Sequence, residues 1–223
     1  MISEAPSHSE DGASCIRHQG RQGKGEGVRK VVLIGGIGSG KSTVCGMFGD
    51  LGAGVVKLDD IGHDVLFMPA VKAALRDAFG AEIFDSEGAV VRSALAAAAF
   101  DTAEHTAALN AITHPAIMNE CFRRVDELGK THDAVVVEVT SGDMTRAAFS
   151  WADAVIAVSA PEALRIERAC ARGEQSEADV RARIARQATD EQRESIADFV
   201  IENVSTLDDV RAAVARVWSA LVR

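Results

Sequence analysis

The sequence predicts a three-layer α/β fold, in which helices cover both faces of a five-stranded parallel sheet. Short apolar runs rich in β-branched residues alternate with longer helical stretches, and this alternation is typical of parallel sheets. The runs are continuously apolar, as in strands that are buried on both faces. At 223 residues, of which 47% are hydrophobic, the chain can bury one full core.

Charge, hydropathy and cysteine spacing argue against several classes of protein: nucleic-acid binders, membrane-spanning proteins and disulfide-bonded proteins. The formal net charge of -9 argues against a nucleic-acid binder that is held by phosphate contacts. No apolar run approaches the roughly 20 residues that a membrane-spanning helix needs. The four cysteines are far apart and form no C-x-x-C pair. We therefore expect a cytoplasmic protein with free thiols and no nucleic-acid or membrane partner. The oligomeric state stays open between a monomer and a weak oligomer.

The first 28 residues differ in composition from the rest of the chain. They are rich in Ser, Gly, His and charged residues, and they contain no apolar stretch of signal-peptide length. A segment of this kind buries too little apolar surface to become ordered. We expect a disordered leader over residues 1–28 and one folded domain over residues 29–223.

The five expected strands are the apolar runs of that domain. The first run stops at Gly35, and the fourth is followed by Ser159-Ala160-Pro161. Glycine, proline and small polar residues are typical of the turns that end strands. The expected strands cover residues 31–34, 54–58, 134–139, 154–158 and 199–201.

Helical composition fills the segments between these strands. One helix is expected from Lys41 to about Leu51, and the last helix over 207–221. The long segment of about 62–130 is expected to be a helical insert on the substrate side, and the Arg- and Glu-rich stretch of about 162–190 a lid. Breaks in the insert are expected at Pro69, at 85–88 and at His114-Pro115.

Residues 35–42, Gly-Gly-Ile-Gly-Ser-Gly-Lys-Ser, match the phosphate-loop pattern G-x-x-x-x-G-K-[ST]. A strand is expected before the motif and a helix after it, as the P-loop NTPase fold requires. The glycines let backbone N–H groups face a phosphate, Lys41 reaches the β- and γ-phosphates, and Ser42 offers a hydroxyl to Mg²⁺. The motif predicts a nucleotide with Mg²⁺, and we expect ATP to be that nucleotide. The expected ATP-binding residues here are Gly36, Gly38, Ser39, Gly40, Lys41, Ser42 and Thr43.

Carboxylates end two of the expected strands. Glu138 closes the third strand and is either a second Mg²⁺ anchor acting through water or a solvated strand-end acid. Asp59 and Asp60 end the second strand, which we expect to lie one strand over from the phosphate loop. A carboxylate at that place could accept the proton of an incoming hydroxyl.

Arginines crowd the expected lid. Arg168 and Arg172 are four residues apart and share a helix face near Gly173. Two guanidinium groups on one face suit a lid that closes over a triphosphate. The alternative is a solvated helix in which arginines pair with glutamates, and composition by itself favours that alternative.

The phosphate loop indicates a nucleotide but no particular reaction. A GTPase would need the guanine-reading pattern Asn-Lys-x-Asp, which the sequence lacks. A short domain with one phosphate loop and an Arg-rich lid fits a small-molecule kinase best.

Together with the phosphate loop, an ordered set of short motifs over residues 31–207 resembles the dephospho-coenzyme A kinase family. The most specific of them is Leu-Asn-Ala-Ile-Thr-His-Pro at 109–115, which matches the family's Leu-Asn-x-Ile-x-His-Pro. Each short motif is weak alone, but together they occur in the family's order. The others are Leu-Gly-Ala at 51–53, Leu-Asp-Asp-Ile-Gly-His at 58–63, Phe79-Gly80, Gly88 with Arg92, Arg168 with Arg172, Arg183-Ile184-x-x-Gln187 and Ala-Asp-x-Val-Ile-x-Asn at 197–203.

Three positions depart from the family pattern. Lys57 stands where the family usually has the first of two acids, and Val91 replaces an acid before Arg92. Residues 139–144 lack the family's Pro-Leu-Leu, which the resemblance places against the acceptor. The motifs that are expected to bind ATP therefore match the family, and the departures lie in the segments that are expected near the acceptor.

The resemblance implies ATP-dependent phosphorylation of the ribose 3′-hydroxyl of dephospho-coenzyme A, the last step of coenzyme A biosynthesis. It implies catalytic roles for Asp59, Lys41 and Arg168. Two alternatives stay open: a P-loop kinase for another small molecule or a nucleoside monophosphate, and a non-catalytic nucleotide-binding regulator. The remaining expected contacts are Arg172 and Asn203 with ATP, Arg92 and His114 with the acceptor, and Ser42 and Glu138 with the metal.

Overall fold

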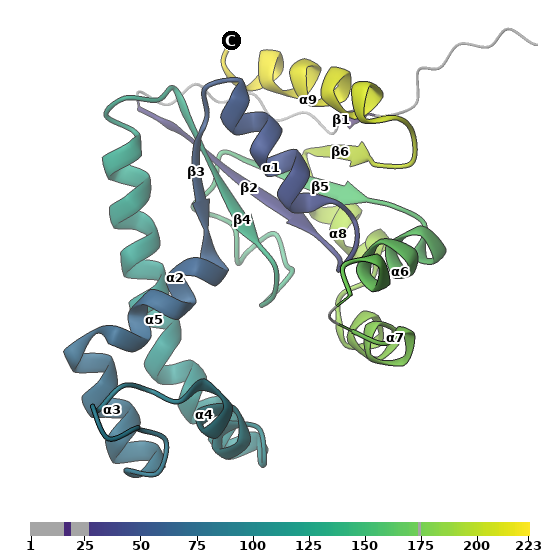
Figure 1. Cartoon of the computed structure of the whole chain (residues 1–223). Coiled ribbons are helices and arrows are strands. Elements are labelled where there is room, and N and C mark those ends of the chain that lie inside the picture. The colour runs from purple at the N-terminus through teal and green to yellow at the C-terminus, as the bar shows by residue number, and fades with distance from the viewer. Residues whose placement is uncertain (1–15, 19–26, 174) are drawn as a thin grey trace, which may run out of the picture.

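The computed structural model describes residues 16–18, 27–173 and 175–223, and its centre is one six-stranded sheet (Figure 1). The strand order is β1-β6-β5-β2-β4-β3, and β2 to β6 run parallel. The expected parallel five-stranded sheet is therefore confirmed. The parallel strands are β2 (Arg29–Gly35), β3 (Gly54–Lys57), β4 (Ala134–Val139), β5 (Ala154–Ser159) and β6 (Phe199–Glu202).

A sixth strand, β1 (Ile16–His18), adds to the sheet edge. It pairs antiparallel with β6, so that Arg17 lies opposite Val200. The prediction of a disordered leader is wrong for these three residues, because the edge of β6 offers backbone partners that composition does not reveal. Most of the leader, residues 1–15 and 19–26, lies outside the described residues.

Helices pack on both faces of the sheet, and alternate strand residues supply the two cores. Val31 and Leu33 face a cluster that includes Phe48 of α1 (Lys41–Asp50) and Val214 of α9 (Leu207–Leu221). Val32 and Ile34 belong to the opposite cluster, which α5 (Ala103–Leu128) and α8 (Asp190–Ile196) help to cover (Figure 1). The strands are therefore buried on both faces, as the apolar runs predict.

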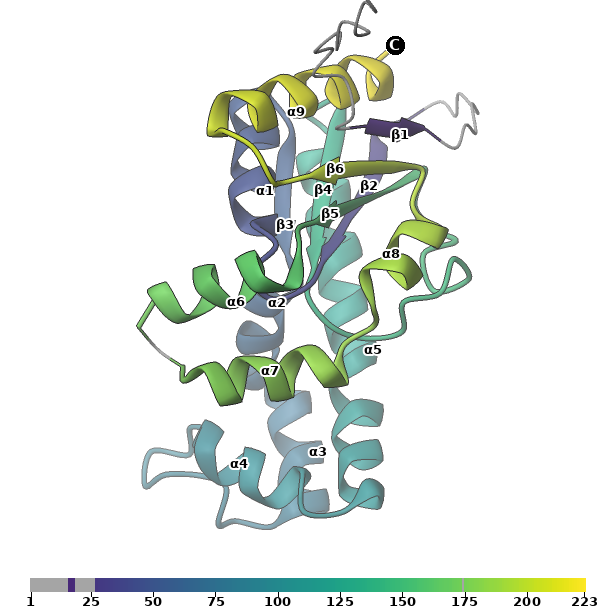
Figure 2. The same ribbon diagram turned by 90° about the vertical axis from the view of Figure 1, so that its right-hand side faces the viewer.

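The expected insert is a group of helices beyond one end of the sheet (Figure 2). Pro69 occupies the first turn of a helix, and the turn at 85–88 separates two helices, as expected. The elements are α2 (Leu58–Asp64), η1 (Val65–Phe67), α3 (Pro69–Phe79), α4 (Arg92–Ala99) and α5.

The expected break at His114-Pro115 is wrong, because α5 runs through it without interruption. A proline inside a helix removes one backbone hydrogen bond and costs roughly 3 kcal/mol. Ile112 before the proline and Ile117 after it both pack against the core, so burial on both sides favours one continuous helix.

The Arg-rich region after β5 consists of three helices: α6 (Glu162–Ala171), α7 (Glu177–Arg186) and α8. Gly173, with φ of 78°, follows α6, and Ser176 and Thr189 begin the next helices with capping boxes. In Figure 2, α6 and α7 form a helical hairpin that projects from the end of the sheet. Among the described residues, no helix is long and apolar enough to cross a membrane.

Candidate active site

The phosphate loop joins β2 to α1 and needs glycine at several positions. Gly38 and Gly40 have φ of 75° and 88°, a region that favours glycine. A side chain on Gly36 would meet the Arg165 guanidinium, and one on Gly40 would meet the Asn203 amide. Two separate requirements, backbone conformation and close packing, therefore explain the glycines of the motif.

The amino end of α1 is open toward a ligand. Its N-cap is Gly40, no described side chain caps the helix, and its first turn contains no acid. The N–H groups of a helix's first turn have no partner within the helix and carry partial positive charge. This end of α1, with Ser42 and Thr43 exposed in its first turn, is therefore suited to bind phosphate.

Lys41, Ser42 and Glu138 form a compact cluster beneath this loop. Lys41 Nζ and Ser42 Oγ each donate to Glu138 Oε1 at 2.7 Å. Glu138 lies on β4, directly beside β2, and only 5% of it is exposed. Of the two readings of this carboxylate, the solvated strand-end acid is wrong.

The electrostatics of the cluster favour a charged carboxylate. Burial acts to raise the pKa of Glu138, but the hydrogen bonds from Lys41 and Ser42, with the Lys41 and Lys57 charges, outweigh it and lower the pKa below 4.5. Nearby Cys45 is buried, and burial together with the Glu138 charge raises the pKa of its thiol to about 12.

A magnesium ion fits the donor set of this cluster. Glu138 Oε2 is buried and has no hydrogen-bond partner among the described residues. Such an unpartnered oxygen, beside the exposed Ser42 hydroxyl, offers the hard oxygen ligands that Mg²⁺ prefers.

The expected lid arginines have different surroundings. Arg168 Nη1 donates to the Asn203 backbone oxygen at 2.9 Å, and the Asn203 amide donates to Ser39 O at 2.8 Å. This bridge ties α6 and the end of β6 to the phosphate loop, so Arg168 is not merely a solvated charge. Arg172 is exposed at the C-cap of α6.

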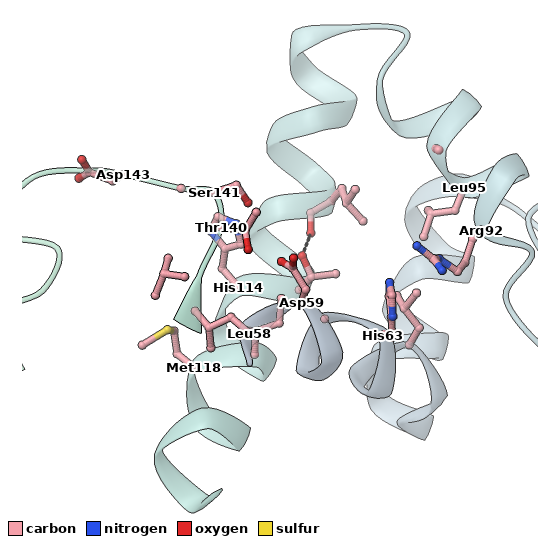
Figure 3. Close-up of a pocket in the computed structure, with 18 of the residues that line it drawn as sticks. Leu58, Asp59, His63, Arg92, Leu95, His114, Met118, Thr140, Ser141 and Asp143 are labelled. Atoms are coloured by element: carbon pink, nitrogen blue, oxygen red, sulfur yellow. Dashed lines mark hydrogen bonds between the residues drawn. The ribbon is translucent and has the colours of Figure 1, made fainter. Parts of the chain in front are cut away.

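A cavity of about 920 Å³ has Asp59, Arg92, His114 and Thr140 in its lining (Figure 3). Its walls come from α2, α4, α5 and the loop after β4. Three of the expected site residues, Asp59, Arg92 and His114, line it together. His114 therefore faces the cavity from within α5 and does not begin a helix.

Asp59 and Asp60 are adjacent in sequence, but they line different hollows of the molecule. Asp59 lines the large cavity, whereas Asp60 lines a different cleft with Lys57 and Arg123. Both lie in the first turn of α2, after β3 has ended at Lys57. The expectation that they lie one strand over from the phosphate loop is wrong, because β4 lies between β3 and β2.

Thr140 joins the cavity to the phosphate loop. It lines the cavity, and its hydroxyl accepts a hydrogen bond of 3.2 Å from Lys41 Nζ. The residues after it, Ser141, Gly142 and Asp143, also line the cavity in place of the family's Pro-Leu-Leu. The altered loop therefore forms part of the cavity wall.

Two residues without a predicted role hold the tip of the phosphate loop. Ile37 N–H donates to Gln187 Oε1 at 3.0 Å, and Arg165 Nε donates to Ile37 O at 3.0 Å. Gln187 belongs to one of the family-like motifs and Arg165 to the Arg-rich region. The contacts join residues 150 and 128 positions apart, so no local pattern could predict them.

Comparisons with known proteins agree with this geometry. The family model described as dephospho-CoA kinase matches residues 29–209. A dephospho-CoA kinase from Corynebacterium glutamicum is 37% identical over 195 residues, which cover 86% of this chain and 97% of that protein. One from Frankia casuarinae is 35% identical and covers 86% of this chain and 83% of its own length.

Solved structures give the same picture. A protein from Thermus thermophilus superposes with a TM-score of 0.74 at 27% identity, covering 88% of this chain and 99% of that one. A dephospho-CoA kinase from Campylobacter jejuni has a TM-score of 0.60 at 25% identity, covering 86% and 97%. The motifs, the fold and these matches place the chain in the dephospho-CoA kinase family.

Proposed function

We propose that this protein transfers the γ-phosphate of ATP to the 3′-hydroxyl of the ribose of dephospho-coenzyme A, the last step of coenzyme A biosynthesis. The observation that carries the proposal is the position of Thr140, which lines the large cavity and also accepts a hydrogen bond from Lys41. An acceptor in the cavity would lie next to a triphosphate on the loop. Family membership supplies the identity of the acceptor.

ATP binds through the phosphate loop and the amino end of α1 in this proposal. Lys41 exchanges its contact with Glu138 for the β- and γ-phosphates, and Ser39 and Thr43 lie in the same binding segment. The backbone N–H groups of the glycine-rich loop and the dipole of α1 favour the phosphate charge. Asn203 and Arg172 lie on the lid side of the loop and complete the expected ATP contacts.

Ser42 and Glu138 would hold Mg²⁺, the latter through water. When bound, Mg²⁺ neutralises charge on the β- and γ-phosphates. The low pKa of Glu138 keeps its carboxylate ionised at neutral pH, which is the form that such a role needs.

Asp59 orients the acceptor hydroxyl and takes its proton. The hydroxyl oxygen forms a bond to the γ-phosphorus while the bond between that phosphorus and the β–γ bridging oxygen breaks, and ADP leaves. Asp59 lies in the cavity wall and is exposed there, so an acceptor can reach it. Positioning and electrostatic stabilisation supply most of the acceleration in reactions of this type.

Arg168 and Arg172 stabilise the charge of the transferred group when the hairpin of α6 and α7 closes over ATP. Guanidinium groups match phosphate oxygens in shape and charge. Arg168 is held near the loop through Asn203, and Arg172 lies one turn further along the helix.

The cavity takes the acceptor. Its volume of about 920 Å³ suits a ligand with a nucleoside, a diphosphate and an extended arm. Arg92 binds an acceptor phosphate, and His114 contacts the acceptor from α5. We place the protein in the cytoplasm, where the free thiols of Cys45, Cys121 and Cys170 would stay reduced.

An acceptor panel tests this function. The protein is incubated with ATP labelled at the γ-phosphate, Mg²⁺ and one acceptor at a time, either dephospho-coenzyme A or a nucleoside monophosphate. We expect label on the 3′-oxygen of dephospho-coenzyme A. Label on a nucleoside monophosphate alone would favour another kinase, and ATP binding without any transfer would indicate a regulator.

A further inference from the structure

The tip of the phosphate loop is held from outside by side chains. Ile37 lies between Gly36 and Gly38, and both of its backbone polar groups bond to distant residues. Its N–H donates to Gln187 Oε1, and its carbonyl accepts from Arg165 Nε, each at 3.0 Å. These bonds fix the peptide groups on both sides of Ile37.

One of these anchors is itself rigid. Arg165 is only 4% exposed, and its Nη1 donates to Asp190 Oδ2 at 2.9 Å. The other oxygen of Asp190 accepts from Arg193 Nη1 at 3.1 Å, and Arg193 is 2% exposed. Two buried arginines and the half-buried Asp190 thus form an ion-pair network that holds the Ile37 carbonyl through Arg165.

The other anchor, Gln187, lies at a joint in the chain. It is the C-cap of α7, with an extended backbone, and Thr189 begins α8 two residues later. The joint therefore connects the expected lid helix with the helix that carries Asp190 and Arg193. From this position between α7 and α8, the side-chain oxygen of Gln187 accepts the hydrogen bond from Ile37 N–H of the phosphate loop.

We infer that Gln187 is a positioning residue for triphosphate binding, because it fixes the Ile37 peptide and so aims the N–H groups that follow it. The inference rests on the proposed function for the identity of the ligand. A peptide group without an external partner can rotate. The ligand must then order that peptide group when it binds, and the free energy of this ordering lowers the affinity. A single neutral hydrogen bond of this kind corresponds to about a fivefold change in affinity.

The test compares two glutamine variants in the whole protein. Gln187→Met keeps the length of the side chain and removes its hydrogen-bonding groups. Gln192→Met is the control, because the Gln192 side-chain oxygen also accepts a backbone N–H, that of Thr189 at 2.8 Å, but it does not contact the loop. Calorimetry measures Kd for ATP and for inorganic tripolyphosphate, and steady-state kinetics measures KM for both substrates.

We expect Gln187→Met to weaken ATP and tripolyphosphate about fivefold each, with KM for ATP rising and KM for the acceptor unchanged. The control should bind both ligands as the wild type does. Wild-type tripolyphosphate affinity in Gln187→Met, or an equal loss in Gln192→Met, would overturn the inference. Because tripolyphosphate binding involves no acceptor, this readout stands apart from the acceptor panel.

Discussion

The side of the site that we assign to the phosphates and the side that we assign to the acceptor are built in different ways. On the phosphate side, Lys41 and Glu138 are 7% and 5% exposed and bond to each other at 2.7 Å. On the acceptor side, Asp59, Arg92 and His114 are exposed in the wall of a 920 Å³ cavity. Lys41 and Glu138 are thus buried and bonded to each other without a ligand, whereas the three cavity residues are accessible to a ligand.

This difference separates the effects of mutation. A substitution on the phosphate side removes a buried partner, so it should change stability and activity together. A substitution on the acceptor side removes an exposed group, so it should change activity and leave stability nearly intact. The variants below test this separation.

The largest effect is expected at Asp59. Asp59→Asn removes the proposed general base, and loss of general base catalysis should lower kcat by about 10²–10⁴-fold. Steady-state assays should find this loss with Kd for ATP and Tm unchanged. Asp60→Asn is the matched control, because Asp60 lines another cleft, and it should keep wild-type turnover. Equal losses in the two variants would remove Asp59 from the role.

The next effect is expected at Lys41. Lys41→Ala removes the ammonium group that we propose stabilises the transferred phosphate. Removal of one such stabilising group costs about 10²–10³-fold in kcat/KM. It also leaves Glu138 buried without its cation, which costs about 3 kcal/mol of unfolding free energy. Denaturant titration and kinetics measure the two losses.

Lys57→Ala serves as the comparison for Lys41, because Lys57 lies beside Glu138 in register but is exposed. Its loss should leave both quantities close to the wild type. An unchanged kcat/KM in Lys41→Ala would contradict the assignment of the phosphate loop.

A smaller effect is expected at Arg92. Arg92→Ala removes the charge-assisted contact that we propose to the acceptor, which should raise KM for dephospho-coenzyme A about tenfold. KM for ATP and Tm should not change, since Arg92 is exposed on the acceptor side. Arg211→Ala, at an exposed arginine of α9 paired with Asp208, is the control. A rise in KM for ATP would show that the two sides are not separate.

The smallest effect concerns the pH dependence of stability. The folded state lowers the pKa of Glu138, so its carboxylate stabilises the fold above the ordinary value of 4.5, and that contribution is lost as pH falls through the folded-state pKa. Glu138→Gln should flatten this acid limb in denaturant titrations across pH. An acid limb that is unchanged in Glu138→Gln would contradict this account of the cluster.

Sequence patterns predict the parts of the molecule that depend on local spacing. The buried parallel strands follow from runs such as 134–139, and the last helix has the expected bounds. The phosphate loop is continuous in sequence, so its motif predicts Lys41 and Ser42, but it does not predict their bonds to Glu138, which lies 97 and 96 residues away. The sequence has two adjacent acids at this place, and only the family resemblance selects Asp59 as the catalytic one. In the structure, Asp59 lines the large cavity and Asp60 lines another cleft.

Other features depend on contacts that no local pattern contains. The bonds from Gln187 and Arg165 to Ile37 span 150 and 128 residues. The pairing of β1 with β6 joins the two ends of the chain, and the uninterrupted path of α5 past Pro115 depends on core packing. Tertiary structure overrides local preference at each of these places.

A crystal structure with a non-hydrolysable ATP analogue, Mg²⁺ and dephospho-coenzyme A tests the central claim most directly. We expect the triphosphate on N–H groups of the phosphate loop other than that of Ile37, which donates to Gln187, and the ribose 3′-oxygen within hydrogen-bond distance of the Asp59 carboxylate, facing the γ-phosphorus. A triphosphate bound elsewhere, or an acceptor whose 3′-oxygen lies away from Asp59, would contradict it.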